Sequence, residues 1–380
     1  MSEPRFHLAI VGTRGVPPRY GGFETFAAEL GKSLVGRGHR VTVYCRRNLY
    51  PDLRGDWKGI ERVELPAVGH KYLETVSHTL LSSIDAFRRA FDAVLVCNAA
   101  NAFALPLTRI ARVPVAINVD GIERTRRKWN ALGRLVYQVG ESWSVRFADE
   151  VVADAKVIRD YYREQFAIDA TVIPYGSSLP SGESDILAEL GLDSRKFVLY
   201  VSRFEPENNP LEVVEAYRRV ETDVPLVMVG TAPYSSRLIS KLHEHRSEKI
   251  LFPGAVYGSD YADLQKNALL YVQATEVGGT HPAMIEAMGS GGAVLANGTP
   301  ENREVGGDTV EYFELGPSET LSTRLQELLD DPAAIEAMRG PARERAAARY
   351  SWERVTEMYE ELVWRITGAS TSRLPGVSAV

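Results

Sequence analysis

The sequence predicts an α/β protein with two doubly wound, mostly parallel sheets, each in its own domain. The chain has 380 residues, whereas a single domain usually holds about 100–200. Short apolar runs alternate with segments of helical period, which is the pattern of βαβ units. A stretch rich in Pro, Gly and Ser, residues 174–182, interrupts this alternation, which then starts again. These three observations together indicate two successive α/β units.

The first half opens with a predicted strand at residues 6–11 and a glycine-rich turn, after which a helix starts at Gly22 or Phe23. Gly36 and Gly38 mark the end of this helix, since glycine commonly follows a helix. Further strands are predicted at residues 40–45, 93–97, 113–119, 150–153 and 171–173. Helical or loop sequence separates them, so we expect parallel pairing.

The second half repeats the pattern, with strands predicted at residues 197–202, 226–230, 250–252, 269–273 and 293–296. An amphipathic helix at 210–220 follows the first of them, and a long helix with one apolar face comes near the end of the chain. We place an N-terminal domain at 1–178 and a C-terminal domain at 179–350. A helix at 351–368 is expected to pack back toward the first domain, and residues 369–380 to be disordered.

Charge is distributed unevenly between the two halves. The chain carries a net charge of −6, but residues 1–180 hold 25 Lys and Arg against 19 Asp and Glu, whereas the rest hold 19 against 31. A basic first half favours an anionic partner, such as a phosphate-bearing substrate or the anionic surface of a membrane. Ordinary scatter of surface charge would also give this difference. We predict no nucleic-acid partner.

Composition and missing motifs narrow the chemistry. Cys45 and Cys97 lie in apolar runs and fit neither a disulfide framework nor a zinc site, and no secretory leader is evident, so we expect a cytoplasmic protein with reduced thiols. The sequence has no Gly-x-Gly-x-x-Gly after its first strand, no phosphate-binding P-loop motif, no close His/Cys cluster and no Asp-x-Asp pair. We therefore expect no cofactor and no metal ion.

Two segments of the first half could bind a ligand. The loop from Gly12 to Glu24 includes Arg14 and Arg19, and its Gly21-Gly22 pair opens a helix, whose N-terminal amides favour an anion. Asp120 follows a predicted strand, where its carboxylate could accept a proton from a sugar hydroxyl. Each segment also fits a simpler structure, a tight turn with solvated arginines or an Asp turn. A basic run with a tryptophan follows Asp120 and would suit a phosphorylated lipid headgroup or a solvated surface: residues 124–129.

The second half has two further candidates. Arg203 follows a predicted strand, where a guanidinium could clamp a diphosphate and stabilise a leaving group. The strongest candidate is the glycine-rich segment 276–289, which leads into a short helix whose first amides could hold phosphate oxygens. Glu286 lies among apolar residues in that helix, and the paired hydroxyls of a ribose would give its carboxylate two donors. A capping loop with a structural Glu is the alternative.

In this order and spacing, the motifs resemble the retaining nucleotide-sugar glycosyltransferases of family four, which have the two-Rossmann-domain GT-B architecture. The resemblance rests on Gly21-Gly22, on residues 36–43 and 173–176, on Arg203, and on residues 282–289. It implies a nucleotide-diphosphate sugar as donor, with Arg203, Asn208, Gly279, Thr280, His281, Pro282 and Glu286 on the donor side. It also implies an acceptor beside Gly21, Gly22, Arg14, Arg19 and Asp120, with Asp120 and Arg203 as the catalytic pair.

Residues 12–17, 119–121 and 206–209 resemble the rhamnosyltransferase-like branch, which serves bacterial polysaccharide assembly. Two positions depart from the family. Asn208 stands where the group usually has Lys, and Gly278 where it has the first of two glutamates.

The resemblance therefore implies a transferase that moves a sugar, with rhamnose as the branch's example, to a glycan, lipid-linked or small-molecule acceptor with retention of anomeric configuration. Peripheral association with an anionic membrane would fit the basic first half. Two other functions stay open: a sugar-nucleotide epimerase or hydrolase on the same scaffold, and a degenerate, non-catalytic subunit that binds a nucleotide sugar.

Overall fold

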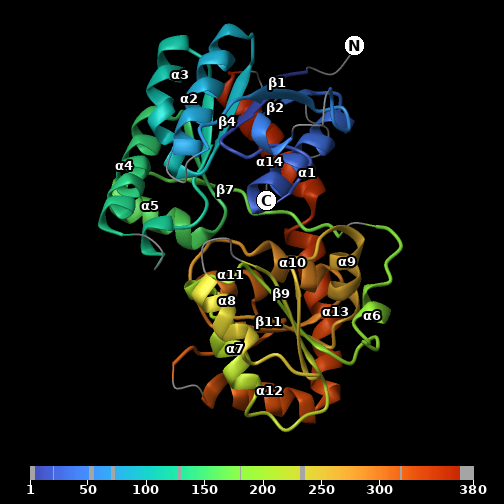
Figure 1. The fold of residues 1–380 in the computed structure, drawn as a ribbon. Coiled ribbons are helices and arrows are strands. Elements are labelled where there is room, and N and C mark those ends of the chain that lie inside the picture. The colour runs from blue at the N-terminus through green and yellow to red at the C-terminus, as the bar shows by residue number, and fades with distance from the viewer. Residues whose placement is uncertain are drawn as a thin grey trace. The chain divides into compact units, whose positions relative to one another are not determined.

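The computed structural model describes residues 5–19, 21–50, 55–69, 73–126, 130–179, 181–231, 236–316 and 319–368 (Figure 1). The chain forms two compact units. The first contains Met1–Arg124, Ala131–Tyr175 and Trp352–Val380, and the second contains Thr125–Asn130 and Gly176–Ser351. Each unit is a parallel sheet with helices on both faces, which confirms the predicted fold class. The predicted domain boundaries stay predictions, and the predicted disordered tail lies outside the described residues.

The first sheet has seven strands in the described residues, all paired in parallel. Their spatial order is β3 (Glu61–Leu65), β2 (Arg40–Arg46), β1 (His7–Val11), β4 (Ala93–Cys97), β5 (Val115–Asn118), β6 (Glu150–Ala153) and β7 (Thr171–Val172). The central strands are buried apolar runs because helices cover them on both sides.

Two helix layers cover this sheet. One contains α1 (Gly22–Gly36) and α14 (Trp352–Ile366), which pack on each other over one core. In that core the rings of Phe26 and Tyr359 lie 5.2 Å apart. The other layer, over a second core, is formed by α2 (Leu73–Arg88), α3 (Leu105–Ala111), α4 (Ala131–Phe147) and α5 (Lys156–Phe166), with the short turns η2 (Ala99–Ala104) and η3 (Glu123–Thr125). A third short turn, η1 (Arg47–Leu49), follows β2.

The second sheet has six parallel strands in the described residues. Their order is β10 (Ile250–Gly254), β9 (Leu226–Val229), β8 (Val198–Val201), β11 (Leu270–Gln273), β12 (Ala293–Asn297) and β13 (Glu311–Phe313). The connecting helices are α6 (Ile186–Glu189), α7 (Pro210–Tyr217), α8 (Ser236–His243), α9 (Gly258–Asn267), α10 (Pro282–Gly289), α11 (Pro300–Gly306), α12 (Glu319–Asp330) and α13 (Pro332–Arg349), with η4 (Pro206–Asn208). Two cores lie on opposite faces of this sheet.

Two strands, β3 and β13, have no counterpart in the sequence prediction. Both are edge strands, each hydrogen-bonded to a single neighbour. An edge strand needs fewer apolar residues: four of the five residues in β3 are only partly buried, and β13 has three residues. Neither gives the continuous apolar run by which the other strands were predicted.

Candidate active site

The predicted donor residues of the second unit meet where the strand order reverses. The chain passes from β8 to β9 and β10 on one side of the sheet, and then to β11 on the other side of β8. A crevice forms outside the carboxyl ends of two such strands and commonly binds a ligand. Here the backbone N–H of Glu276, after β11, donates to the carbonyl oxygen of Glu207, after β8, at 2.9 Å. The side-chain amide of Asn209 donates to the carbonyl oxygen of Ala274, also at 2.9 Å.

Arg203 and Asn208 have different environments in this crevice. Arg203 follows β8 with its side chain exposed, and no carboxylate among the described residues pairs with its guanidinium. Asn208 is 4% exposed, and its side-chain amide donates to the carbonyl oxygen of Arg203 at 2.7 Å. The hydroxyl of Tyr200 donates to the carbonyl oxygen of Asn208 at 2.7 Å. Asn208 therefore holds the loop that positions Arg203. A lysine at position 208 could make the same hydrogen bond only if its side chain no longer extended into the crevice.

His281 lies at the N-cap of α10 and is neutral at pH 7. Burial lowers the pKa of its imidazole to about 4. Its Nδ1 lies 2.8 Å from Oδ1 of Asn302, whose Nδ2 donates to the carbonyl oxygen of Asn297 at 2.9 Å. Because that bond fixes Oδ1 toward the histidine, Nδ1 must carry the proton and Nε2 the lone pair. Nε2 is buried without a hydrogen-bond partner among the described residues.

Gly278 faces the same ring. A Cβ built on this glycine would overlap Nε2 of His281. The residue at which this chain departs from the resembling family therefore packs against an imidazole that a hydrogen bond to Asn302 holds in place. A glutamate at position 278 would have to displace that ring.

Glu286 lies within α10 and already has a protein partner. Its side chain is 9% exposed, and its Oε2 accepts a short hydrogen bond from the hydroxyl of Tyr261 on α9. The side-chain amide of Gln265, one turn further along α9, donates to the same hydroxyl at 2.9 Å. Gly279 and Thr280 are buried just ahead of α10, which begins at Pro282 as predicted.

One residue of the predicted basic run is buried in the second unit. Arg126 is 6% exposed and its guanidinium lies 3.6 Å from the carboxylate of Glu207, which has no exposed surface. Two charges removed from water in this way need each other, since either alone would be costly. The expected solvated or headgroup-binding surface is therefore wrong for Arg126. Residues 127–129 of the run lie outside the described residues.

The first unit has its own reversal point, between β1 and β4. The turn after β1 approaches β4 closely, because a Cβ at Gly12 would overlap the carbonyl oxygen of Cys97 and the side chain of Asn101. The backbone N–H of Arg14 donates to Oε1 of Glu24 at 3.0 Å. Burial raises the pKa of the Glu24 carboxyl, although the Arg14 amide opposes the shift. This turn is fixed to the first turn of α1 by that contact.

The other predicted acceptor residues of this loop differ in the contacts that they make with the rest of the fold. The guanidinium of Arg19 donates to the carbonyl oxygen of Leu49 at 2.6 Å and lies 4.9 Å from the ring centre of Tyr50. Arg19 is thus tied to its own loop region. Gly21 is the N-cap of α1, and a Cβ at Gly22 would meet no atom within 4 Å. Packing does not require glycine at position 22.

Asp120 follows β5 in a left-handed conformation with φ of 59°. Its backbone N–H donates to Oδ1 of Asn118 at 3.0 Å, and Nδ2 of Asn118 donates to the hydroxyl of Tyr359 at 2.8 Å. Burial raises the pKa of the Cys97 thiol, and the charges of Glu24 and Asp120 raise it further. The carboxylates of Glu24 and Asp120 are therefore both near enough to the end of β4 to raise the pKa of the same buried thiol.

Comparisons with known proteins show that the chain belongs to the glycosyltransferases. A model of the glycosyl transferase 4-like domain matches residues 21–176, and a model of glycosyl transferases group 1 matches residues 183–346. The chain is a GT-B glycosyltransferase. Alpha-monoglucosyldiacylglycerol synthase of Streptococcus pneumoniae is 22% identical over 74% of the chain and 69% of that relative. Glycogen synthase of Mycobacterium tuberculosis is 27% identical over 66% of the chain and 63% of that relative.

Solved structures share the fold of this glycosyltransferase. Sucrose-phosphate synthase from Thermosynechococcus elongatus superposes with a TM-score of 0.82 at 20% identity, over 96% of this chain and all of that one. Anabaena HepE in complex with UDP and glucose gives 0.77 at 16% identity, over 95% of this chain and all of that one. At these identities the likeness shows the fold alone.

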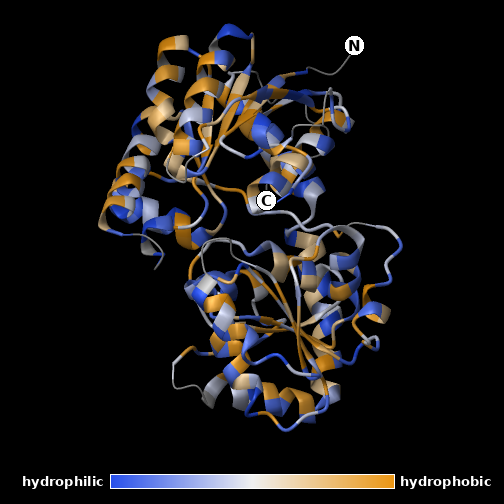
Figure 2. Cartoon of the chain, viewed as in Figure 1, coloured by the Kyte–Doolittle hydropathy of each residue, from blue (hydrophilic) through white to orange (hydrophobic). Residues whose placement is uncertain are grey.

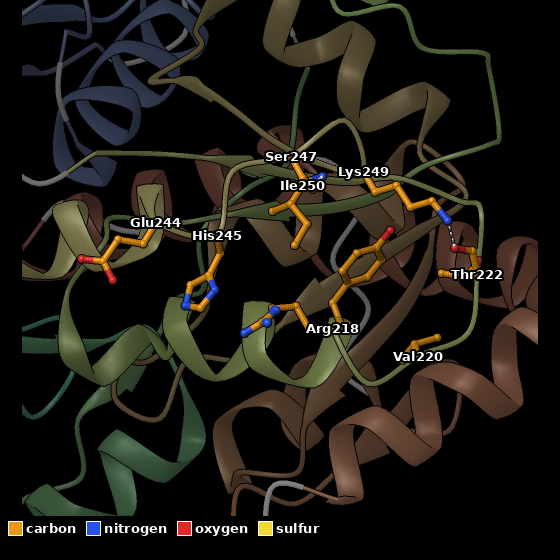
Figure 3. A pocket seen from close by; sticks show the side chains of 9 residues that line it. Arg218, Val220, Thr222, Glu244, His245, Ser247, Lys249 and Ile250 are labelled. Carbon is orange, nitrogen blue, oxygen red and sulfur yellow. Dashed lines mark hydrogen bonds between the residues drawn. The ribbon is translucent and has the colours of Figure 1, made fainter.

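Other features of the described glycosyltransferase residues lie away from these loops. No group of three or more His, Cys, Asp or Glu side chains is placed to hold a metal ion, and no described helix is long and apolar enough to cross a bilayer. The second unit contains a hollow of about 350 Å³, and Figure 3 shows the side chains that line it. It contains none of the predicted site residues and is lined by Tyr217, Arg218, Val220, Thr222, Glu244, His245, Ser247, Lys249 and Ile250.

Sequence reasoning missed four side chains that lie among the predicted site residues of the second unit: Tyr261, Gln265, Asn302 and Glu207. Tyr261 and Gln265 stand four residues apart and so share one face of α9, a spacing visible in the sequence. Nothing local shows that this face meets Glu286, which lies 25 residues later. Asn302 and Glu207 are likewise long-range partners, of His281 and Arg126.

Proposed function

We propose that this glycosyltransferase binds a nucleotide-diphosphate sugar on its second unit and transfers the sugar, with retention of anomeric configuration, to an acceptor bound by its first unit. The observation that carries the proposal is the exposed guanidinium of Arg203 at the strand-order reversal, where no carboxylate in the described part of the chain pairs with it. A cation held there stabilises the negative charge that develops on a leaving diphosphate. We also propose that the sugar transfer requires neither a metal ion nor a cofactor.

Different donor residues bind different parts of the nucleotide sugar. The backbone amides of Thr280 and His281 and the guanidinium of Arg203 hold the phosphates, and Glu286 holds the ribose hydroxyls. A carboxylate can accept about four hydrogen bonds, so the bond from Tyr261 orients Glu286 and leaves capacity for the ribose. The lone pair on Nε2 of His281 suits a hydroxyl of the transferred sugar.

The acceptor residues belong to the first unit. Asp120 orients the acceptor hydroxyl or takes its proton, and Gly21, Gly22 and Arg14 border the acceptor. The resemblance to the rhamnosyltransferase-like branch favours rhamnose as the sugar and bacterial polysaccharide assembly as the setting. Glucose is the competing sugar, because the structure of HepE holds UDP and glucose. We propose a glycan or lipid-linked acceptor and peripheral association with an anionic membrane, in line with the basic first half and the glucosyldiacylglycerol named in one relative.

The first experiment identifies the donor. A thermal-shift screen of nucleotide-diphosphate sugars, including thymidine-diphosphate rhamnose and UDP-glucose, should show one donor that stabilises the protein more than its bare nucleotide. With that donor and an acceptor, Arg203→Ala should lower kcat about a hundred-fold or more. Arg218→Ala, which removes an exposed arginine just after α7, is the matched control and should keep wild-type turnover. Unchanged turnover in Arg203→Ala contradicts the proposal.

Product analysis separates this function from its alternatives. A transferase releases free nucleotide at a substantial rate only when an acceptor is present. An epimerase or hydrolase converts the donor alone, with Asp120 and His281 acting on it directly. A non-catalytic binding subunit shows calorimetric binding of the donor and no turnover across a panel of acceptors.

A further inference from the structure

Exposed apolar side chains concentrate on one part of the first unit. Among the described residues, twelve large apolar side chains are more than a third exposed, and eleven of them belong to α2, α3, α4 or the residues just before α2. These eleven, called here the apolar face, are Val68, Leu73, Val76, Leu80, Leu81, Ile84, Ile110, Leu132, Leu135, Val136 and Val139. The twelfth, Tyr257, is in the second unit. Scattered exposed apolar residues are normal in proteins, but a gathering of this size indicates a binding surface.

Helix α2 presents its apolar side outward. Most residues of its buried side are polar: His78 and Ser82 have no exposed surface, and Thr79 and Ser83 are 1% and 4% exposed, while Ala86 is buried beside them. Leu73, Val76, Leu80, Leu81 and Ile84 lie on the opposite, exposed side. A helix in water normally has the reverse arrangement. The exposed side of α2 is therefore suited to contact a partner less polar than water.

Helix α4 has the same property in a different form. Leu132, Leu135, Val136 and Val139 follow helical spacing and are 42% to 69% exposed. Leu135 and Val139, together with Gln138, Ser142 and Trp143, border a shallow hollow of about 230 Å³. The one acidic residue of α4, Glu141, is buried, and its carboxylate accepts a hydrogen bond from the hydroxyl of Tyr161 at 2.7 Å. The exposed side of α4 thus carries apolar and basic residues, with the uncharged Gln138 and Ser142, and no carboxylate.

The three helices form one layer over the first sheet. α2 packs on α3 and α3 packs on α4, and Figure 1 shows them together on the same side of the sheet. Figure 2 shows apolar turns in all three. The exposed charges around them are mainly positive: Arg88, Arg112, Arg134 and Arg146. The two carboxylates of α2 are each paired, Glu74 with Arg46 at 3.1 Å and Asp85 with Arg89 at 2.8 Å.

We propose that the apolar face, with Arg88, Arg112, Arg134 and Arg146 around it, docks this glycosyltransferase on the surface of an anionic lipid bilayer. The proposal deepens the membrane association in the proposed function by naming the surface responsible. Apolar side chains and flanking arginines suit the boundary between acyl chains and anionic headgroups. A second copy of the chain fits less well, since a two-fold interface would bring the same arginines toward one another.

The test is sedimentation of the purified full chain with vesicles. Phosphatidylcholine vesicles that contain phosphatidylglycerol should bind the protein more tightly than phosphatidylcholine alone, and about 1 M salt should weaken the binding because the screening length falls to about 3 Å. Leu135→Glu with Val139→Glu should lower the partition coefficient about ten-fold or more. Arg134→Gln with Arg146→Gln should lower it roughly thirty-fold on anionic vesicles only.

Matched controls use the second unit. Tyr257→Glu changes the exposed apolar residue outside the apolar face, and Arg218→Gln with Arg237→Gln removes two exposed arginines elsewhere. Both should bind vesicles as the wild type does. All variants should keep the wild-type melting temperature and the stabilisation by donor, which shows that they fold.

Three outcomes would overturn the inference. The wild type does not bind anionic vesicles, or the α4 variants bind as tightly as the controls, or sedimentation velocity shows a dimer that Leu135→Glu with Val139→Glu dissociates while vesicles are not bound. Donor stabilisation reports on the second unit and is independent of these results. A failed docking surface is therefore distinguishable from a failed donor assignment.

Discussion

Gly278 explains how one residue can depart from a family pattern and still fit its site. Its Cα faces Nε2 of His281, and the ring is held by Asn302, so a side chain at position 278 has no room. The glycine and the histidine therefore form a matched pair. The crevice gives up a carboxylate and gains a neutral imidazole whose lone pair points inward.

This pairing predicts that restoring the family's glutamate does harm. Gly278→Glu should lower the free energy of unfolding by about 1–3 kcal/mol, the usual cost of overpacking a core, and weaken donor binding. Thermal unfolding and calorimetry with the identified donor measure both effects. Gly340→Glu, at an exposed glycine of α13 with no atom near its Cβ position, is the control.

The decisive variant combines Gly278→Glu with His281→Ala. Removal of the ring should recover most of the lost stability, because the collision is with that ring. If the double variant is as unstable as the sum of the two single ones, the pair is not coupled.

Site residues could be predicted from the sequence where the signal is local. The glycine-rich loop before α10 and the buried position of Glu286 both follow from neighbouring residues, and the structure places them as expected. Partners from distant segments could not be predicted in this way. Nothing near Tyr261 in the sequence indicates its hydrogen bond to Glu286. Likewise, Arg126 stands in a basic run of the sequence, but the fold buries it against Glu207.

Secondary structure followed the same division between local and long-range signals. Central strands such as β1 and β4 are continuous apolar runs because both faces are covered, so the sequence alone locates them. The edge strands β3 and β13 are shorter or partly exposed, and their pairing with a neighbour decides that they are strands. The exposure of the apolar side of α2 is likewise visible only in the fold, because helical period does not say which side faces the sheet.

The buried polar side of α2 makes the stability of the first unit depend on pH. Burial lowers the pKa of His78 to about 4, against about 6.5 in an unfolded chain. Above pH 6.5 the ring is neutral in both states and its contribution is complete. As the pH falls from 6.5 to 4, the unfolded chain takes up a proton that the folded chain does not, so stability falls by up to about 3 kcal/mol.

Substitution of His78 should remove that part of the pH dependence. His78→Leu is expected to flatten the fall in melting temperature between about pH 7 and about pH 4.5. This is roughly the range over which the unfolded wild-type chain takes up its extra proton. Ser82→Ala changes the neighbouring buried polar residue and has no titrating group, so it should keep the wild-type slope. Parallel pH profiles for wild type and His78→Leu would contradict the assignment.

At the scale of the whole molecule, sequence order and structural units do not coincide. Helix α14 is the last described helix in the chain, yet it belongs to the first unit, where it packs on α1. Its side chains at Val355, Tyr359, Leu362 and Val363 are at most 2% exposed within the first core. The hydroxyl of Tyr359 also accepts the hydrogen bond from Asn118, next to Asp120. The end of the chain therefore supports the acceptor residues near its beginning.

Truncation before Trp352 should unfold the first unit and spare the second. Four fully buried side chains are worth at least about 6 kcal/mol, which is comparable to the whole stability of a typical domain. Calorimetry of this truncated chain should show the loss of one unfolding transition, while the transition that the donor stabilises remains. Truncation after Gly368 removes only residues outside the described part of the chain and should keep both transitions. If the chain cut before Trp352 keeps both as well, α14 does not hold the first unit together.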